Sequence, residues 1–182
     1  MPDSQPKSRI ELLDFGSETP PARLSYTERV VHDGVGVSRC TLQPNPGTEI
    51  GATQFTVAIH EGTPFQMEWR LPEMREVERR RIVAGDLHIN PGDRPIFQRW
   101  SSSPRILVIA MEQAFIKQIV GEAFDGKELE LRTQIGIRDP VIRRAMATAW
   151  RRELAERGGG RPALYGGAGV GARLCMSFDA YG

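Results

Sequence analysis

The side chains best suited to acid–base or metal chemistry in this chain are three histidines, His32, His60 and His88. A metal ion needs three or four donors that converge on one point. The sequence contains no His-x-His pair, so each histidine stands alone. His60 and His88 could meet on neighbouring strands beside Glu61 or Asp86, but isolated histidines are usually only hydrogen-bonded. We therefore expect no metal site.

The cysteines give no sign of a disulfide framework or a thiolate zinc site. Cys40 and Cys175 lie far apart and in no CxxC arrangement. The N-terminus, Met-Pro-Asp-Ser-Gln-Pro, is polar, and no apolar run is long enough to cross a bilayer. These features predict reduced thiols, no membrane contact and a cytoplasmic location.

Nucleotide-binding and nucleophile motifs are weak. Gly167 to Ala172 matches GxGxxA, but no apolar strand precedes it and no acidic ribose ligand follows. The sequence has no GxxxxGK loop, GxSxG elbow or HExxH helix. We expect no enzymatic activity and no cofactor.

Composition is that of an ordinary folded protein. The 182 residues are 40% hydrophobic and 26% charged, which suits one domain with a core or a small barrel with a helical appendage. The formal net charge of +1 supplies no basic field for phosphates. Direct nucleic-acid binding by this chain alone is not expected.

Short apolar segments separated by turn residues predict a β-sandwich or barrel over residues 21–111, after a loose segment at residues 1–20. Phe65 to Leu71 alternates strictly between apolar and polar residues, and Arg75 to Arg81 has the charge of an exposed edge strand. The expected strands are Arg23–Val31, Gly36–Leu42, Gln54–His60, Phe65–Leu71, Val77–Val83, Leu87–Asn90, Pro95–Trp100 and Arg105–Met111.

Helical periodicity replaces the strands over residues 112–157. Ala114 to Val120 predicts a short helix, and Asp139 with Pro140 begins a longer one that ends near Arg157. Its apolar stripe packs either on the barrel or against a second chain, and both alternatives stay open. The candidate dimerisation residues are Val141, Ala145, Met146, Ala149 and Trp150, in a stripe that also holds Ile142 and Leu154. The glycine-rich residues 158–182 are expected to be irregular or weakly helical.

A small-molecule pocket inside the barrel fits these residues better than a catalytic site. Apolar side chains could line the interior, with histidines or Arg99 as polar contacts near a mouth; equally, they could simply fill the core. The candidate ligand-binding residues are Phe55, Val57, His60, Met67, Trp69, His88 and Phe97.

The order of segments resembles the N-terminal sensor and dimerisation region of AraC/XylS-type transcriptional regulators. The resemblance covers residues 20–182 and rests on Val57-Ala-Ile-His-Glu-Gly62, Gly85-Asp-Leu-His-Ile-Asn-Pro91 followed by Pro95, Gly136-Ile-Arg-Asp-Pro140 and Leu164-Tyr165. It implies a mainly β fold: a cupin-like jelly-roll barrel followed by C-terminal helices that pair two chains. Cupins of the metal-binding kind carry a later histidine ligand where this chain has Ile96.

The resemblance also implies a function. We expect a non-enzymatic domain that senses a small-molecule effector, dimerises, or does both. In the family a helix-turn-helix region normally follows, and it is absent before Gly182, so we expect a truncated regulator. A reading-frame slip near Tyr165, where glycine replaces the expected helix residues, would explain this. The alternatives are a stand-alone cupin-like binding protein or a cupin enzyme.

Overall fold

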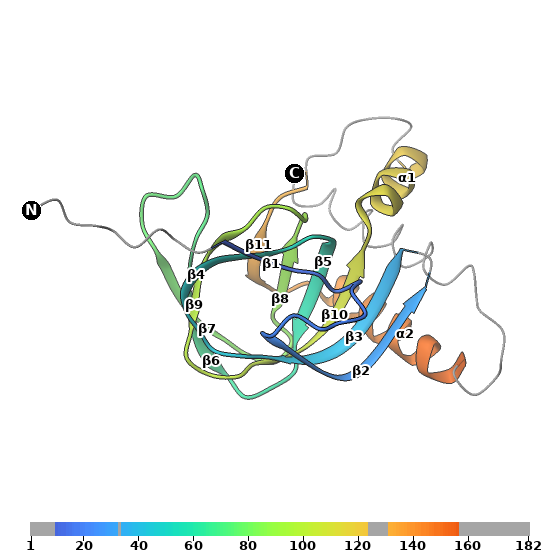
Figure 1. The fold of residues 1–182 in the computed structure, drawn as a ribbon, viewed down its shortest axis with the longest axis horizontal. Helices are drawn as coiled ribbons and strands as arrows, with labels where there is room; N and C mark the ends of the chain where they lie inside the picture. The colour runs from blue at the N-terminus through green and yellow to red at the C-terminus, as the bar shows by residue number, and fades with distance from the viewer. Residues whose placement is uncertain (1–9, 33, 124–130, 157–182) are drawn as a thin grey trace, which may run out of the picture.

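The computed structural model describes residues 10–32, 34–123 and 131–156, which form two β-sheets and two helices (Figure 1). The five-stranded sheet has the order β1-β4-β9-β6-β7, and the six-stranded sheet has the order β11-β8-β5-β10-β3-β2. The strands are β1 Ile10–Leu13, β2 Leu24–His32, β3 Val35–Leu42, β4 Asn45–Ala52, β5 Phe55–His60, β6 Phe65–Arg70, β7 Glu78–Ile82, β8 Leu87–Asn90, β9 Ile96–Trp100, β10 Arg105–Met111 and β11 Gln134–Ile137. The helices are α1 Gln113–Ala123 and α2 Pro140–Glu156.

The two sheets face each other around a shared interior core. Because successive side chains on a strand point to opposite faces, each strand contributes alternate residues to this core. The five-stranded sheet supplies Met67, Trp69 and Trp100 among others, and the six-stranded sheet supplies Cys40 and Val108 among others. Burial raises the pKa of the Cys40 thiol to about 12, which leaves it protonated and unreactive.

The outer face of the six-stranded sheet is covered by the helices. Ile116 of α1 and Ile142, Met146 and Trp150 of α2 pack against the outward-facing residues of β5, β8 and β10 in a second core. The guanidinium of Arg39 on β3 lies 4.8 Å from the ring centroid of Trp150, which also links α2 to the sheet. This helical layer therefore completes the fold.

The start of α2 follows the sequence prediction. The Asp139 carboxylate accepts hydrogen bonds from the backbone amides of Val141, at 2.7 Å, and Ile142, at 2.9 Å. Pro140 occupies the first helical position, where no amide donor is needed. The predicted cap and helix are confirmed, and so is the mainly β architecture.

Three strands were not expected from the sequence. β1 lies in the segment predicted to be loose and pairs in parallel with β4, and β11 lies in the predicted helical region and pairs with β8. β4 begins with Asn45-Pro-Gly47, which resembles a turn, but this stretch forms an irregularity in the β4–β9 pairing. Gly47 has a φ of 121°, a backbone conformation that glycine adopts without strain.

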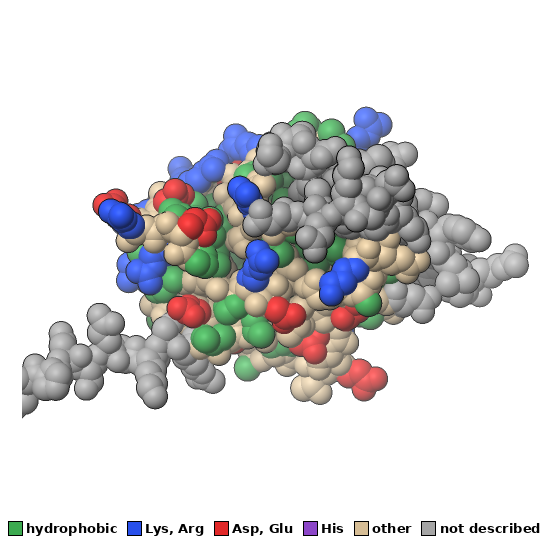
Figure 2. All heavy atoms as spheres, turned by 90° about the horizontal axis from the view of Figure 1, so that it is seen from above, with side chains coloured by type: hydrophobic (Ala, Val, Ile, Leu, Met, Phe, Trp, Pro, Cys, Tyr) green, Lys and Arg blue, Asp and Glu red, His purple; other side chains and the backbone are tan. Residues whose placement is uncertain are grey.

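The surface charges are distributed without a single dominant patch on the face shown in Figure 2, where basic side chains stand in separate groups between acidic and uncharged ones. As predicted, the charged strand β7 is exposed and lies at the edge of its sheet. No helix within the described residues has the length and apolar character needed to span a membrane.

Candidate functional site

A cavity of about 120 Å³ lies between the two sheets. One of its sides is mostly apolar and includes Ile50, Phe65 and Met67 beside the polar Gln98; the other carries polar groups from β5 and β8. The described lining residues are Leu13, Phe15, Leu42, Ile50, Gly51, Ala52, Thr56, Ala58, His60, Phe65, Met67, His88, Asn90, Gln98, Trp100, Pro104 and Ile106.

The pairing register of β5 and β8 explains why their polar side chains line the same side of the cavity. Thr56 on β5 pairs with Asn90 on β8, and Ala58 pairs with His88, so these four residues share the inward face. His60 follows Ala58 two residues along β5 and points to the same face. Two adjacent strands thus bring one hydroxyl, one amide and two imidazoles to the cavity.

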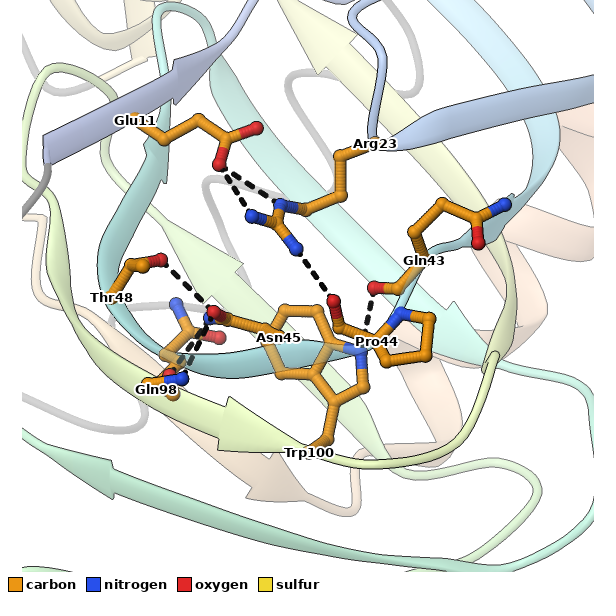
Figure 3. Close-up of polar contacts among 9 residues, drawn as sticks. Glu11, Arg23, Gln43, Pro44, Asn45, Thr48, Gln98 and Trp100 are labelled. Carbon is orange, nitrogen blue, oxygen red and sulfur yellow. Dashed lines mark hydrogen bonds and ion pairs between the residues drawn. The ribbon is translucent and has the colours of Figure 1, made fainter.

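The cavity's residues on β9 are held by a network at one end of the sheets (Figure 3). The Trp100 indole donates a hydrogen bond of 3.1 Å to the carbonyl of Gln43. Asn45, which is fully buried, donates to the Gln98 carbonyl at 2.8 Å. Gln98 also donates its side-chain amide to the Ile50 carbonyl at 3.1 Å. These bonds set the orientation of Gln98 and Trp100 without using the Gln98 side-chain oxygen.

A second network fixes the N-terminal residues that line the cavity. The Gln54 side-chain oxygen accepts from the Phe15 amide at 3.1 Å, and its amide nitrogen donates to Asp14 at 2.7 Å. The hydrogen bond from Gln54 is the main reason that the pKa of Asp14 is lowered. Leu13 and Phe15 are thereby held against the interior.

The two histidines differ in their hydrogen bonding. The Nε2 of His60 lies 3.0 Å from the Thr63 carbonyl, which can only accept, so this nitrogen carries the proton. His88 forms no hydrogen bond to any described residue, and part of its surface borders the cavity. The pKa of His88 is lowered to about 4, mainly because burial disfavours the charged ring and also because His60 and Arg80 are nearby. His88 is therefore uncharged at neutral pH.

The carboxylates considered as metal partners of these histidines are engaged elsewhere. Asp86 is fully buried, accepts from Arg138 at 2.9 Å and accepts from the Val83 amide at 3.0 Å. Burial alone would raise its pKa, but the bonds from Arg138 and Val83 keep that pKa below its usual value. Glu61 pairs with Arg39 at 2.6 Å. Within the described ranges, no three His, Cys, Asp or Glu side chains are grouped so that they could hold a metal ion.

The sequence-predicted ligand residues fall into separate places. His60, Met67 and His88 line the cavity. The prediction that Phe55 and Val57 line the interior is wrong, because strand alternation places them under the helices. Trp69 belongs to the interior core without bordering the cavity.

Phe97 and Arg99 also lie outside the cavity. They alternate with the inward-facing Ile96, Gln98 and Trp100, so they point to the outer face of β9. There Phe97 lies under the guanidinium of Arg70, and Arg99 donates to Glu68 at 2.8 Å. Ile96, in the place of the later cupin ligand, is a buried core residue.

The candidate dimerisation stripe is divided by the fold. Met146 and Trp150 are buried against the six-stranded sheet of the same chain, so a dimer seam built on them is wrong. Val141 is 60% exposed and Ala145 is half-buried. The side chains of Ala149 and Leu154, and the whole of residues 158–182, lie outside the described residues.

Sequence reasoning missed Thr56, Asn90 and Gln98. A signal was present: Thr56, Ala58 and His60 alternate with Phe55, Val57 and Ile59, so one face of the strand has small or polar side chains and the other only large apolar ones. The prediction placed the apolar face in the barrel interior. It is instead the face covered by helices.

Comparison with known proteins gives a likeness of fold. No family model matches the chain, and no curated protein matches it. The structure of apo ToxT K231A from Vibrio cholerae is similar, with a TM-score of 0.54, 8% identity and coverage of 82% of this chain and 56% of that chain. The AraC-like transcriptional activator CuxR matches with a TM-score of 0.49, 9% identity and coverage of 81% and 52%.

A Cupin 2 conserved barrel domain protein from Salinispora arenicola matches over 50% of this chain and 77% of its own, with a TM-score of 0.36 and 17% identity. The likeness to ToxT shows a shared fold. This chain spans about half the length of ToxT and of CuxR.

Proposed function

We propose that this chain is the effector-sensing barrel of an AraC/XylS-type transcriptional regulator, with no catalytic activity of its own. The observation that carries the proposal is the two-sided cavity inside the barrel. Mostly apolar cavities with a few convergent polar groups are the usual form of a small-molecule site. The fold that the chain shares with ToxT agrees with the barrel that the sequence resemblance to AraC/XylS-type regulators implies.

The helical layer suggests how binding could be transmitted. β5 and β8 carry cavity residues on one face and α2 contacts on the other, so a ligand that shifts these strands would also shift the helix. Any pairing of two chains would use surfaces other than Met146 and Trp150, which the sheet already covers.

A ligand screen by thermal shift tests the proposal. We expect at least one small molecule to raise the melting temperature by about 5 to 10 °C when its concentration is about 100 times its Kd. The variant Ala58→Leu places a larger side chain in the cavity and should abolish the shift. Ala114→Leu, on the exposed side of α1, is the matched control and should retain it.

Failure of a broad library to produce a shift, or a shift that Ala58→Leu leaves unchanged, would contradict a sensing cavity. A stand-alone binding protein would bind through the same cavity, so a second measurement is needed. Transcript profiles of cells with and without the chain, each with and without the ligand found, distinguish the two. A ligand response that depends on the chain is expected for a regulator, and its absence favours the stand-alone protein.

A further inference from the structure

Building on the proposed function, we propose that the cavity selects an uncharged, ring-sized molecule that carries a hydroxyl or amide group, and that it rejects carboxylates and ammonium ions of the same size. The inference rests on the size of the cavity, on the absence of Asp, Glu, Lys and Arg among its described lining residues and on the unfilled hydrogen-bonding capacity of that lining.

The size of the cavity limits the ligand to about one ring. Its volume is about 120 Å³. An engineered apolar cavity of roughly 150 Å³ binds benzene. A six-membered ring with one small polar substituent is therefore the scale that fits, and fused rings or long chains are too large.

The lining offers no partner for a charged ligand. None of the described lining residues is Asp, Glu, Lys or Arg. The nearby buried carboxylate of Asp86 is already paired with Arg138. A histidine could in principle supply a positive charge, but the pKa of His88, at about 4, leaves its ring uncharged at pH 7. Burial of an ion without a partner is strongly unfavourable.

The polar residues that line the cavity have both donors and acceptors to spare. Thr56 is only 7% exposed, and neither its hydroxyl nor the His88 ring bonds to any described residue. Asn90 uses its side-chain oxygen to accept from Gly92, at 2.8 Å, which leaves its amide protons for a ligand. The Gln98 side chain donates to Ile50, which leaves its oxygen as an acceptor. A hydroxyl or amide group, which both donates and accepts, matches this set.

Four probes of one size test the charge preference: benzyl alcohol, benzoate, benzylammonium and toluene. Titration calorimetry of the purified chain at pH 7 should give the tightest binding for benzyl alcohol. We expect toluene to bind about 5 to 10 times more weakly, because it leaves the polar groups unpaired. Benzoate and benzylammonium should bind at least about 100 times more weakly than the alcohol.

The variant Thr56→Val tests the hydrogen-bonding side directly. It should weaken the binding of benzyl alcohol about 5-fold and leave the binding of toluene unchanged, since only one hydroxyl contact is removed. Retained toluene binding also shows that the variant is folded. Thr53→Val is the matched control, because the Thr53 hydroxyl likewise bonds to no described residue but does not border the cavity. It should leave both affinities unchanged.

The outcomes separate this inference from the proposed function. Equal or tighter binding of benzoate or benzylammonium would overturn the neutral-ligand inference and leave a sensing cavity in place. The inference would also be overturned if Thr56→Val lost as much affinity for toluene as for benzyl alcohol. It would be overturned as well if Thr53→Val lost as much affinity for benzyl alcohol as Thr56→Val does. If none of the four probes binds and the wider library also yields nothing, both the inference and the proposed function are wrong.

Discussion

The two faces of strands β5 and β8 differ sharply although they belong to the same short segments. The outward residues Phe55, Val57, Ile59, Leu87 and Ile89 are all apolar and closely covered by α2 and its neighbours. The inward residues are small or polar and leave a cavity: Thr56, Ala58, His60, His88 and Asn90. One face therefore stabilises the fold, and the other leaves room for a ligand.

The difference shows which face of these strands contributes less to the stability of the fold. An apolar face filled by a helix gains the full benefit of burial. A face with a Thr56 hydroxyl that bonds to no described residue, an uncharged His88 and empty space forgoes part of that benefit. Such a local departure from good packing is expected at a functional site.

The largest expected loss of stability comes from truncating a side chain of α2 that packs on the outer face of the sheet. Ile142→Ala removes a fully buried side chain of α2 and should lower the free energy of unfolding by about 4 kcal/mol. Val141→Ala, one residue earlier and 60% exposed, should change it by less than about 0.5 kcal/mol. Urea denaturation of both variants measures the contrast. Similar small losses would mean that α2 is not packed on the sheet.

A somewhat smaller loss of stability is expected when the pH is lowered, because of His88 on the inner face. The pKa of His88 is about 4 in the folded chain and 6.5 without the fold's influence. The unfolded state therefore takes up a proton first, and stability is lost as the pH falls through this interval. The expected loss between pH 6.5 and 4 is about 3 kcal/mol, with stability fully present above pH 6.5.

The comparison with His88→Gln isolates this effect. His60 on β5, Asp86 before β8 and Arg80 on β7 act on His88 and are unchanged in the variant. Urea denaturation at several pH values should show a steeper acid loss for the original chain than for His88→Gln. Parallel curves would show that His88 does not titrate in this way.

The smallest expected effect concerns the ion pairs that border the filled face. Arg39 contacts Trp150 and pairs with Glu28 and Glu61, each at 2.6 Å. Arg39→Gln should lower stability by about 1 kcal/mol and speed hydrogen exchange in α2. Arg99→Gln, whose side chain is 54% exposed in its pair with Glu68, should have almost no effect. Equal effects would indicate that Arg39 does not hold the helix.

Much of the fold was predictable from local pattern. Leu87–Asn90 and Arg105–Met111 were predicted with the bounds that the structure has, and the Asp139 cap and Pro140 start of α2 were predicted from residue type alone. β1 and β11 were missed because each is only four residues long and depends on pairing with β4 or β8. β4 was missed because Pro46 and Gly47 resemble a turn, whereas the β4–β9 pairing accommodates them as an irregularity.

The candidate site was predicted less well, for a reason that is general to strands. Alternation along β5 shows that Phe55 and Thr56 point to opposite faces, but it does not show which face is the interior. A position covered by a helix and a position inside the barrel are both buried, so Val57 and His60 have similar burial and opposite surroundings.

The amino-acid sequence by itself determined the local preferences of this chain: the alternating strands, the turn residues, the capped helix and the absence of closely spaced metal-binding motifs. Those properties depend on neighbours a few residues apart. The tertiary structure alone decided that α2 covers the outer face, and that Thr56, His88 and Gln98 meet around a cavity. Those contacts join residues distant in the chain, and they form only when the two sheets and the helix pack together.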